Sequence, residues 1–260
     1  MDQYNTLIKF AHELADISKI EINKMFRKDD SWTIKPNKKN KRPQIVTKAD
    51  IAAEKAIRLL INKQFPSHGI IGEELGNENV EADFVWVIDP IDGTKAFVAG
   101  LPVFGSMIGL MYNKKSCLGL IDQPYTNERI WGSKNGSFLN NKKIYSRKFK
   151  SINKTICAIT DPAMFINKDK KIYKIINDNV LYIRHGTDCW GYAMCAAGKI
   201  DLVIEKDLEL WDIVAATAIL EGAGGIITSW NGKDPASDRS VIAAANKETY
   251  NYFVDLINHF

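Results

Sequence analysis

The segment FVWVIDPIDGT, residues 84–94, constrains the fold more than any other part of the chain. It opens with an unbroken apolar run, which is typical of a strand buried inside a sheet. Two aspartates, Asp89 and Asp92, follow at once, separated by a proline and an isoleucine. Carboxylates at the end of a buried strand cost free energy unless a cation meets them. The fold must therefore cover this strand and bring positive charge to its end.

The rest of the chain alternates between helical and strand-like patterns. Apolar residues follow helical spacing through residues 7–26, and a second helix is expected to begin near Asp50. Apolar runs at 103–111 and 117–121, bounded by Gly, Asn or Pro, predict strands joined by hairpins. Strand-like and helical runs alternate again beyond residue 154. We therefore expect an α/β (α+β) fold with layered sheets.

Length and composition suit one large domain. The chain has 260 residues, of which 45% are hydrophobic and 25% charged, enough for one large core without disulfide staples. The polar, basic stretch 141–153 is the candidate boundary between two halves of the chain. We expect a single domain of two closely packed halves, about 1–145 and 146–260.

The same features limit the location and the partners. The net charge is only +4, the first twenty residues lack the apolar run of a secretory signal, and no apolar run is long enough to span a bilayer. Four cysteines without a C-x-x-C pair suit a reducing compartment. We expect a cytoplasmic protein with no membrane partner.

The loop KPNKKNKRPQ, residues 35–44, carries five basic residues and two prolines. It is either a solvated surface loop or a basic flap that closes over an anionic substrate. It lacks the aromatic side chains on which bases stack, which argues against a nucleic-acid partner.

Four acidic residues stand out: Glu73 follows a short apolar stretch, Asp89 and Asp92 follow the apolar strand, and Asp212 is at the start of a helix. Mg²⁺ prefers carboxylate, water and phosphate oxygens in an octahedral array. The proline of Asp-Pro-Ile-Asp fixes one backbone angle, so a turn there could aim both aspartates and the carbonyl of Ile91 at one or two ions. The simpler interpretation is a turn with two capping carboxylates.

The residues after Asp92 fit phosphate chemistry. Gly93 allows close backbone approach, and a helix starting at Thr94 would offer free amides to an anion. The Thr94 hydroxyl can donate and accept hydrogen bonds, which suits a residue that orients a nucleophilic water.

Three stretches together resemble the inositol monophosphatase family of magnesium-dependent, lithium-sensitive phosphatases: IGEELG (71–76), WVIDPIDGTKAF (86–97) and LWDIVAATAILEGAGG (210–225). The resemblance implies a layered αβαβα fold, commonly a homodimer, that binds two or three Mg²⁺ ions and is inhibited by Li⁺. One departure is Val214, where the family usually has a small residue.

The resemblance also implies a role for each matching residue. Glu73 and the Ile91 carbonyl would hold the first ion, Asp89 would bridge two ions, and Asp92 and Asp212 would hold the second. The catalytic residues would be Thr94, with Asp50 behind it to orient the attacking water, and Glu73. The backbone of Gly93 and Thr94 would contact phosphate, and Lys38 or Lys39 would close over the site. Asp50 could instead be a helix N-cap.

Within the family, residues 100–110 and 184–205 look most like the histidinol-phosphate phosphatase branch. Asp188 stands where inositol-cleaving members have a small neutral residue, and a carboxylate there suits an ammonium-bearing substrate. Its simpler role is a helix N-cap. Glu205 stands where inositol-cleaving members carry a glutamate that binds substrate hydroxyls.

The sequence therefore predicts a Mg²⁺-dependent phosphomonoesterase that uses a metal-activated water, with histidinol phosphate as the small-molecule substrate. The alternatives are an inositol-1-monophosphatase, a 3′-phosphoadenosine-phosphate phosphatase, and a nonenzymatic RNA-binding member, against which the retained acidic residues argue.

Overall fold

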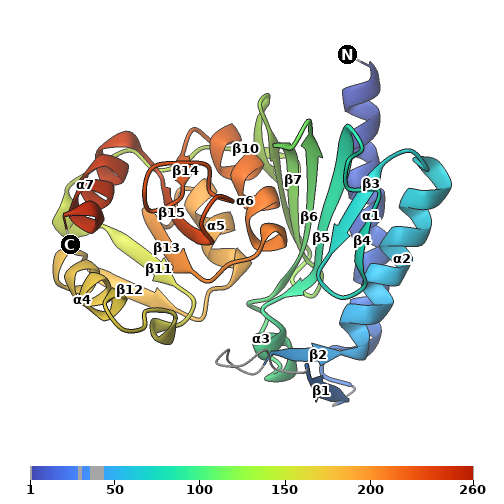
Figure 1. Ribbon diagram of the computed structural model, residues 1–260, viewed down its shortest axis with the longest axis horizontal. Coiled ribbons are helices and arrows are strands. Elements are labelled where there is room, and N and C mark those ends of the chain that lie inside the picture. The colour runs from blue at the N-terminus through green and yellow to red at the C-terminus, as the bar shows by residue number, and fades with distance from the viewer. Residues whose placement is uncertain (1, 29–30, 36–43, 260) are drawn as a thin grey trace.

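The computed structural model describes residues 2–28, 31–35 and 44–259, which form five stacked layers (Figure 1). The helices of these layers are α1 (Asp2–Met25), α2 (Lys48–Gln64), α4 (Asp169–Asn179), α5 (Cys189–Ala196), α6 (Leu210–Gly222) and α7 (Lys247–Asn258). An eight-stranded sheet lies between the α1–α2 layer and the α5–α6 layer, and a five-stranded sheet lies between α5–α6 and the α4–α7 layer. The predicted αβαβα fold class is confirmed. None of the helices in the described ranges is both long and apolar enough to cross a membrane.

The eight-stranded sheet is antiparallel except for one parallel pair, β3 with β5. In spatial order its strands are β10 (Lys142–Ile144), β9 (Gly136–Leu139), β8 (Glu128–Ser133), β7 (Lys115–Gln123), β6 (Gly105–Tyr112), β5 (Phe84–Asp92), β3 (Gly69–Gly72) and β4 (Gly76–Glu78). The two apolar runs predicted to form a hairpin become β6 and β7.

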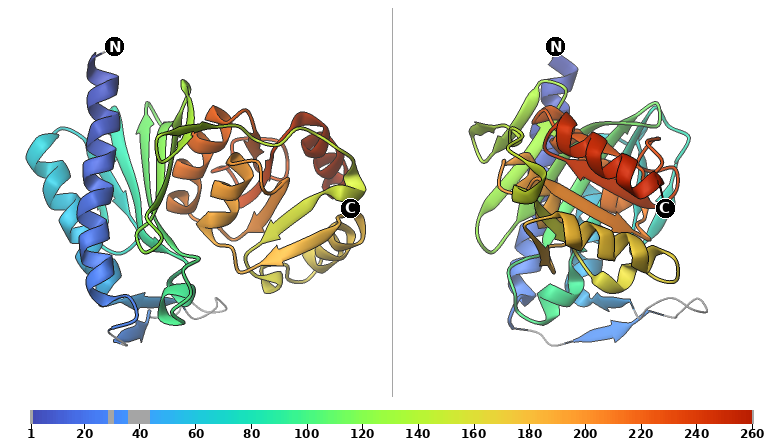
Figure 2. Two further views of the ribbon diagram at one scale, coloured as in Figure 1. Left: turned by 180° about the vertical axis from the view of Figure 1, so that it is seen from behind. Right: turned by 90° about the vertical axis from the view of Figure 1, so that its left-hand side faces the viewer.

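The five-stranded sheet is mixed, and its strands come from the second part of the chain. Their spatial order is β12 (Tyr182–His185), β11 (Ile156–Ile159), β13 (Leu202–Lys206), β15 (Ser240–Ala244) and β14 (Ile226–Thr228). The chain passes between the two sheets through residues 145–155, which include a short 3₁₀ helix, η1 (Ile152–Lys154). Figure 2 shows from two further sides that the first and last helices lie in opposite outer layers.

Strand β5 carries the two aspartates into the centre of the molecule. Residues 85–91 are buried, as the apolar run predicts. The strand continues through Asp92, with a register shift against β6 between Asp89 and Asp92. The interpretation of Asp-Pro-Ile-Asp as a turn is therefore wrong: it is a bulged strand end, which re-aims side chains without ending the pairing.

Helix α6 lies unusually close to the first sheet because two strand positions are glycines. A Cβ atom on Gly119 would lie 2.0 Å from the carbonyl oxygen of Ala215, and one on Gly109 would lie 2.6 Å from Cγ1 of Val214. Val214 itself packs in an apolar cluster with side chains of β5 and β6. The close approach holds the first turn of α6, which carries Asp212, near the end of β5.

Three smaller elements complete the site region. A two-stranded ribbon of β1 (Trp32–Ile34) and β2 (Ile45–Thr47) leads into α2. The short helices α3 (Thr94–Val98) and η2 (Pro162–Met164) follow β5 and β11.

Candidate active site

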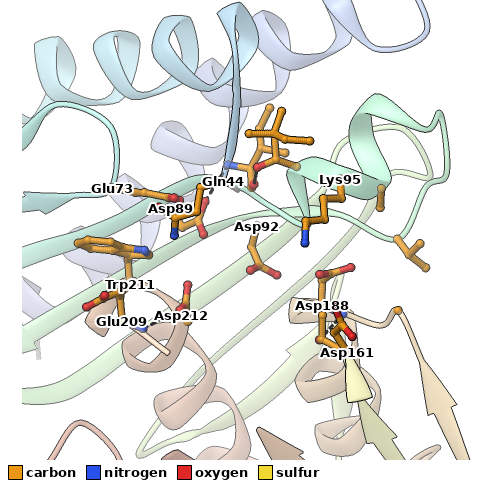
Figure 3. Close-up of a pocket in the computed structure, with 18 of the residues that line it drawn as sticks. Gln44, Glu73, Asp89, Asp92, Lys95, Asp161, Asp188, Glu209, Trp211 and Asp212 are labelled. Atoms are coloured by element: carbon orange, nitrogen blue, oxygen red, sulfur yellow. Dashed lines mark hydrogen bonds between the residues drawn. The ribbon is translucent and has the colours of Figure 1, made fainter. Parts of the chain in front are cut away.

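A pocket of about 480 Å³ opens between the end of β5 and the N-terminal turns of α3, α5 and α6 (Figure 3). Glu73, Asp89, Asp92, Asp188 and Asp212 all line it, as do Ile91, Gly93 and Thr94. The three matching stretches thus meet at one place. Lys38 and Lys39 lie outside the described residues.

Three of the predicted metal ligands converge in the floor of this pocket. One carboxylate oxygen from each of Asp89, Asp92 and Asp212 lies within 4.8 Å of the others. Among the described residues, no lysine, arginine or histidine forms an ion pair with any of the three, and Asp89 is only 2% exposed. Such an oxygen-only set without a basic partner matches what Mg²⁺ requires.

The electrostatics of the three carboxylates point the same way. Burial raises the pKa of Asp89 well above its ordinary value, and the nearby Glu73 and Asp92 raise it further. Burial and then Asp212 raise the pKa of Asp92 to about 8, and burial raises the pKa of Asp212 to about 8 against the hydrogen bond from the Glu209 amide. A divalent cation would relieve both the desolvation and the repulsion.

Glu73 lies beside Asp89 but is held from a different direction. Its Oε1 is 2.8 Å from the Nζ of Lys35, which also lies 2.7 Å from Oε1 of Glu74. The first residue of the basic loop therefore reaches the predicted metal ligand directly. A contact of this kind could not be anticipated from sequence, because 38 positions separate the two residues.

Asp50 and Thr94 form the part of the site that was predicted to orient water. Asp50 is the third residue of α2, where its side chain accepts a hydrogen bond from the backbone N–H of Thr47 at 2.8 Å, while Thr47 is the N-cap. The simpler interpretation of Asp50 as the N-cap is therefore wrong. The Thr94 hydroxyl lies 3.1 Å from the Ile91 carbonyl oxygen and 3.5 Å from Oδ1 of Asp50.

Burial raises the pKa of Asp50 to about 6, opposed by the hydrogen bonds from Thr47. Asp50 is 0% exposed, and the carboxylate oxygen that does not bind Thr47, Oδ1, lies toward the Thr94 hydroxyl. Asp50 is thus a buried acceptor behind a hydroxyl that faces the pocket.

The two predicted substrate residues lie in different surroundings. Asp188 occupies the N-cap position of α5 with a positive φ of 45°, but its side chain makes no capping hydrogen bond. Glu205 is buried, and its carboxylate accepts hydrogen bonds from the Thr160 amide at 3.0 Å and the Tyr192 hydroxyl at 2.8 Å. Glu205 lines a separate small cavity of about 160 Å³, which Asp188 also lines.

Several lining residues were not assigned a role from sequence: Gln44, Lys95, Asp161, Asp207 and Glu209. Glu209 immediately precedes the Leu-Trp-Asp stretch as the N-cap residue of α6, and its backbone N–H donates to Oδ2 of Asp212 at 2.8 Å. Lys95 stands inside the stretch WVIDPIDGTKAF, directly after Thr94, so the sequence pattern already places it beside the predicted site.

The sequence profile of the Inositol monophosphatase family matches residues 3–259. The chain belongs to this family. The resemblance predicted from three short stretches is confirmed.

The similar proteins of this family are named for different phosphatase activities. The bifunctional phosphatase IMPL2, chloroplastic, of Arabidopsis thaliana is 44% identical over 224 residues, which cover 85% of this chain and 63% of the Arabidopsis protein. The match thus spans less than two thirds of that relative. A histidinol-phosphatase of Chlorobaculum parvum is 29% identical over 204 residues, 77% of this chain and 78% of the relative. The structure of an inositol monophosphatase from Zymomonas mobilis matches with a TM-score of 0.85 and 31% identity over 98% of both chains.

Proposed function

We propose that this protein is a magnesium-dependent phosphomonoesterase whose substrate is histidinol phosphate. The observation that carries the proposal is the meeting of Asp89, Asp92 and Asp212 at an open pocket without a basic partner among the described residues. Membership of the inositol monophosphatase family supports the same reaction class.

The residues divide the work as follows. Asp89, Asp92, Asp212, Glu73 and the Ile91 carbonyl would hold the ions. Bound divalent ions supply charge stabilisation at the phosphoryl oxygens and make water a better nucleophile.

Thr94 acts on the attacking water. Its O–H donates toward Asp50 or Ile91, which leaves its oxygen lone pairs to accept a hydrogen bond from that water and to fix its direction. The backbone of Gly93 and Thr94 is proposed to contact the phosphate. Catalysis then comes from positioning and electrostatics, which are the main terms in phosphoryl transfer.

Asp188 favours histidinol phosphate over inositol phosphate. Its half-buried carboxylate faces the pocket and makes no side-chain hydrogen bond to the described residues, so an ammonium group on the substrate would satisfy it. Glu205 is already engaged by Thr160 and Tyr192, which makes a grip on inositol hydroxyls less favourable. The likeness to the Zymomonas mobilis inositol monophosphatase keeps inositol 1-phosphate as the second candidate.

A substrate panel tests both levels of the proposal. Histidinol phosphate, inositol 1-phosphate and 3′-phosphoadenosine 5′-phosphate are compared by phosphate release, with and without Mg²⁺. We expect histidinol phosphate to lead by about tenfold in kcat/KM, which corresponds to about 1.4 kcal/mol of transition-state binding. A lead for inositol 1-phosphate overturns the substrate, and no release from any ester with Mg²⁺ overturns the phosphatase.

We further propose that Li⁺ inhibits by competing for the carboxylate site, and that the protein is a cytoplasmic homodimer without an RNA partner. Lithium titration, sedimentation and filter retention of RNA test the inhibition, the homodimer and the absence of an RNA partner, respectively.

A further inference from the structure

The charge of the pocket is strongly one-sided. Eight of the described residues that line it carry a carboxylate, and a single one, Lys95, carries a basic side chain. A phosphate monoester is itself an anion, so it enters a field that repels it wherever no cation stands. Lys95 is therefore the only fixed positive charge that the described lining offers to the ester.

Lys95 and Asp188 both face the pocket and do not pair with each other. Figure 3 shows the Lys95 side chain, which comes from α3, extending into the pocket between Asp92 and Asp188. Neither side chain makes a hydrogen bond or an ion pair with the described residues. They do interact at a distance: burial, and then the charges of Asp92 and Glu205, raise the pKa of Asp188 to about 8, and the charge of Lys95 opposes this rise.

Two backbone hydrogen bonds fix the position of Asp188. The Asp188 amide donates to Oγ1 of Thr160 at 3.1 Å, and the next amide, that of Cys189, donates to the carboxylate of Asp92. These bonds fix the backbone of Asp188 at the start of α5, beside Gly93, while Lys95 projects from the first turn of α3. A basic and an acidic side chain that both face the pocket, and that make no hydrogen bond or ion pair with the described residues, complement a ligand that carries both charges.

We propose that Lys95 is a specificity-determining residue that binds the phosphate group of the ester while Asp188 binds a cationic group of the same molecule, so that the pocket selects zwitterionic phosphate monoesters. The inference rests on the proposed phosphatase function and deepens it. The phosphate ester of an uncharged polyol provides a partner for Lys95 but leaves the half-buried carboxylate of Asp188 without one. Sites that leave a buried polar group unpaired discriminate strongly against such a ligand.

Crossed binding measurements test the assignment independently of turnover. The full-length Mg²⁺-loaded protein is titrated by calorimetry with inorganic phosphate, which carries only the anion, and with histidinol, which carries only the cation. Lys95→Met should weaken phosphate binding about tenfold, since it removes a charge-assisted hydrogen bond, and should strengthen histidinol binding because a repelling cation is gone. Asp188→Asn should weaken histidinol about tenfold and leave phosphate unchanged or tighter.

Two further variants separate specificity from general damage. Lys95→Arg keeps the charge and should restore phosphate binding. Lys9→Met removes an exposed lysine from α1, beyond the first sheet, and should change neither titration. A Lys95→Met protein that binds phosphate as well as the wild type, or that loses both ligands equally, overturns the proposal.

Kinetics with a matched pair of esters complete the test. Serinol phosphate and glycerol 1-phosphate differ only by an ammonium in place of a hydroxyl. Wild type should prefer the ammonium ester about tenfold, and Asp188→Asn should lose that preference. If kcat/KM is higher for inositol 1-phosphate than for histidinol phosphate, while Lys95→Met weakens only phosphate binding and Asp188→Asn weakens only histidinol binding, the proposed substrate is wrong and the charge selection stands. If kcat/KM is higher for histidinol phosphate but the two variants do not show these separate effects on binding, the selection by Lys95 is wrong and the substrate stands.

Discussion

Asp212 is the member of the carboxylate cluster that α6 contributes, whereas Asp89 and Asp92 both come from β5. We predict that Asp212→Asn lowers kcat more than about a hundredfold, since it removes a charge that holds the ions, and leaves the fold intact. The measurements are steady-state phosphate release and a thermal melt. Asp178→Asn, at an exposed ion pair on α4, is the matched control and should keep full activity.

The Asp212 prediction fails if the variant turns over substrate with an unchanged Mg²⁺ requirement. That outcome would also remove the observation that carries the proposed function.

Single residues differ in how far sequence can place them. Asp89, Asp92 and Asp212 were predictable because each stands in a stretch with a specific local pattern. The contact of Lys35 with Glu73 and that of Thr160 with Glu205 were not, since 38 and 45 positions separate the partners and no local pattern encodes either distance. Only the packed fold brings them together.

Among the elements, α2 braces the hairpin that carries Glu73. Glu54 of α2 is 0% exposed, and its carboxylate accepts hydrogen bonds from the amides of Glu74 at 2.8 Å and Leu75 at 3.1 Å. Arg58, one turn further along, donates to Glu54 at 2.8 Å and to Glu78 at 2.7 Å. Helix α2 thus fixes the backbone of the turn directly after Glu73.

We predict that Glu54→Gln destabilises the protein by about 3 kcal/mol, because it breaks a buried ion pair and turns an amide toward backbone donors. It should also raise the Mg²⁺ concentration needed for half-maximal activity, because Glu73 loses its support. Urea unfolding and a Mg²⁺ titration measure the two effects. Glu81→Gln is the control, since Glu81 pairs with Lys114 in solvent and its loss should cost less than about 0.5 kcal/mol.

An unchanged urea midpoint and an unchanged Mg²⁺ titration in Glu54→Gln would show that the hairpin holds Glu73 without α2.

Element types were easier to predict than their local irregularities. The apolar run before Asp89 predicts a buried strand, and Thr47 with Asp50 predicts a helix start, because both signals are local. The bulge in β5 arises from its pairing with β6, and the proline fixes only one of the angles involved. A sequence pattern therefore indicates that the strand exists but not how it ends.

At the scale of the whole molecule, the central helix layer packs against both sheets. The sequence predicts that the sheets and helices form layers, but not that one helix layer is buried between two sheets. Residues 213–220 of α6 are all buried, so the helix shows no polar stripe to tell which face meets which sheet. Only the glycines of the first sheet reveal how closely it packs. The cluster of Asp89, Asp92 and Asp212 lies where this shared layer meets the end of β5, so its charge is coupled to the stability of the whole fold.

That coupling predicts how stability depends on pH. In the metal-free protein the pKa values of Asp92 and Asp212 are about 8, against 3.8 for the ordinary carboxyl, so the folded state binds more protons than the unfolded state between about pH 4 and pH 8. The free energy of unfolding should therefore fall as pH rises through this window, with the loss complete above about pH 8. Mg²⁺ compensates the same charges, so it should stabilise the protein by several degrees in Tm at about pH 9 and much less at about pH 5. Thermal melts in Mg²⁺ and in EDTA at both pH values measure this, and Asp92→Asn should flatten the pH dependence while weakening the response to Mg²⁺. Equal stabilisation by Mg²⁺ at both pH values would mean that the ion does not replace protons at these carboxylates, and the metal site would have to lie elsewhere.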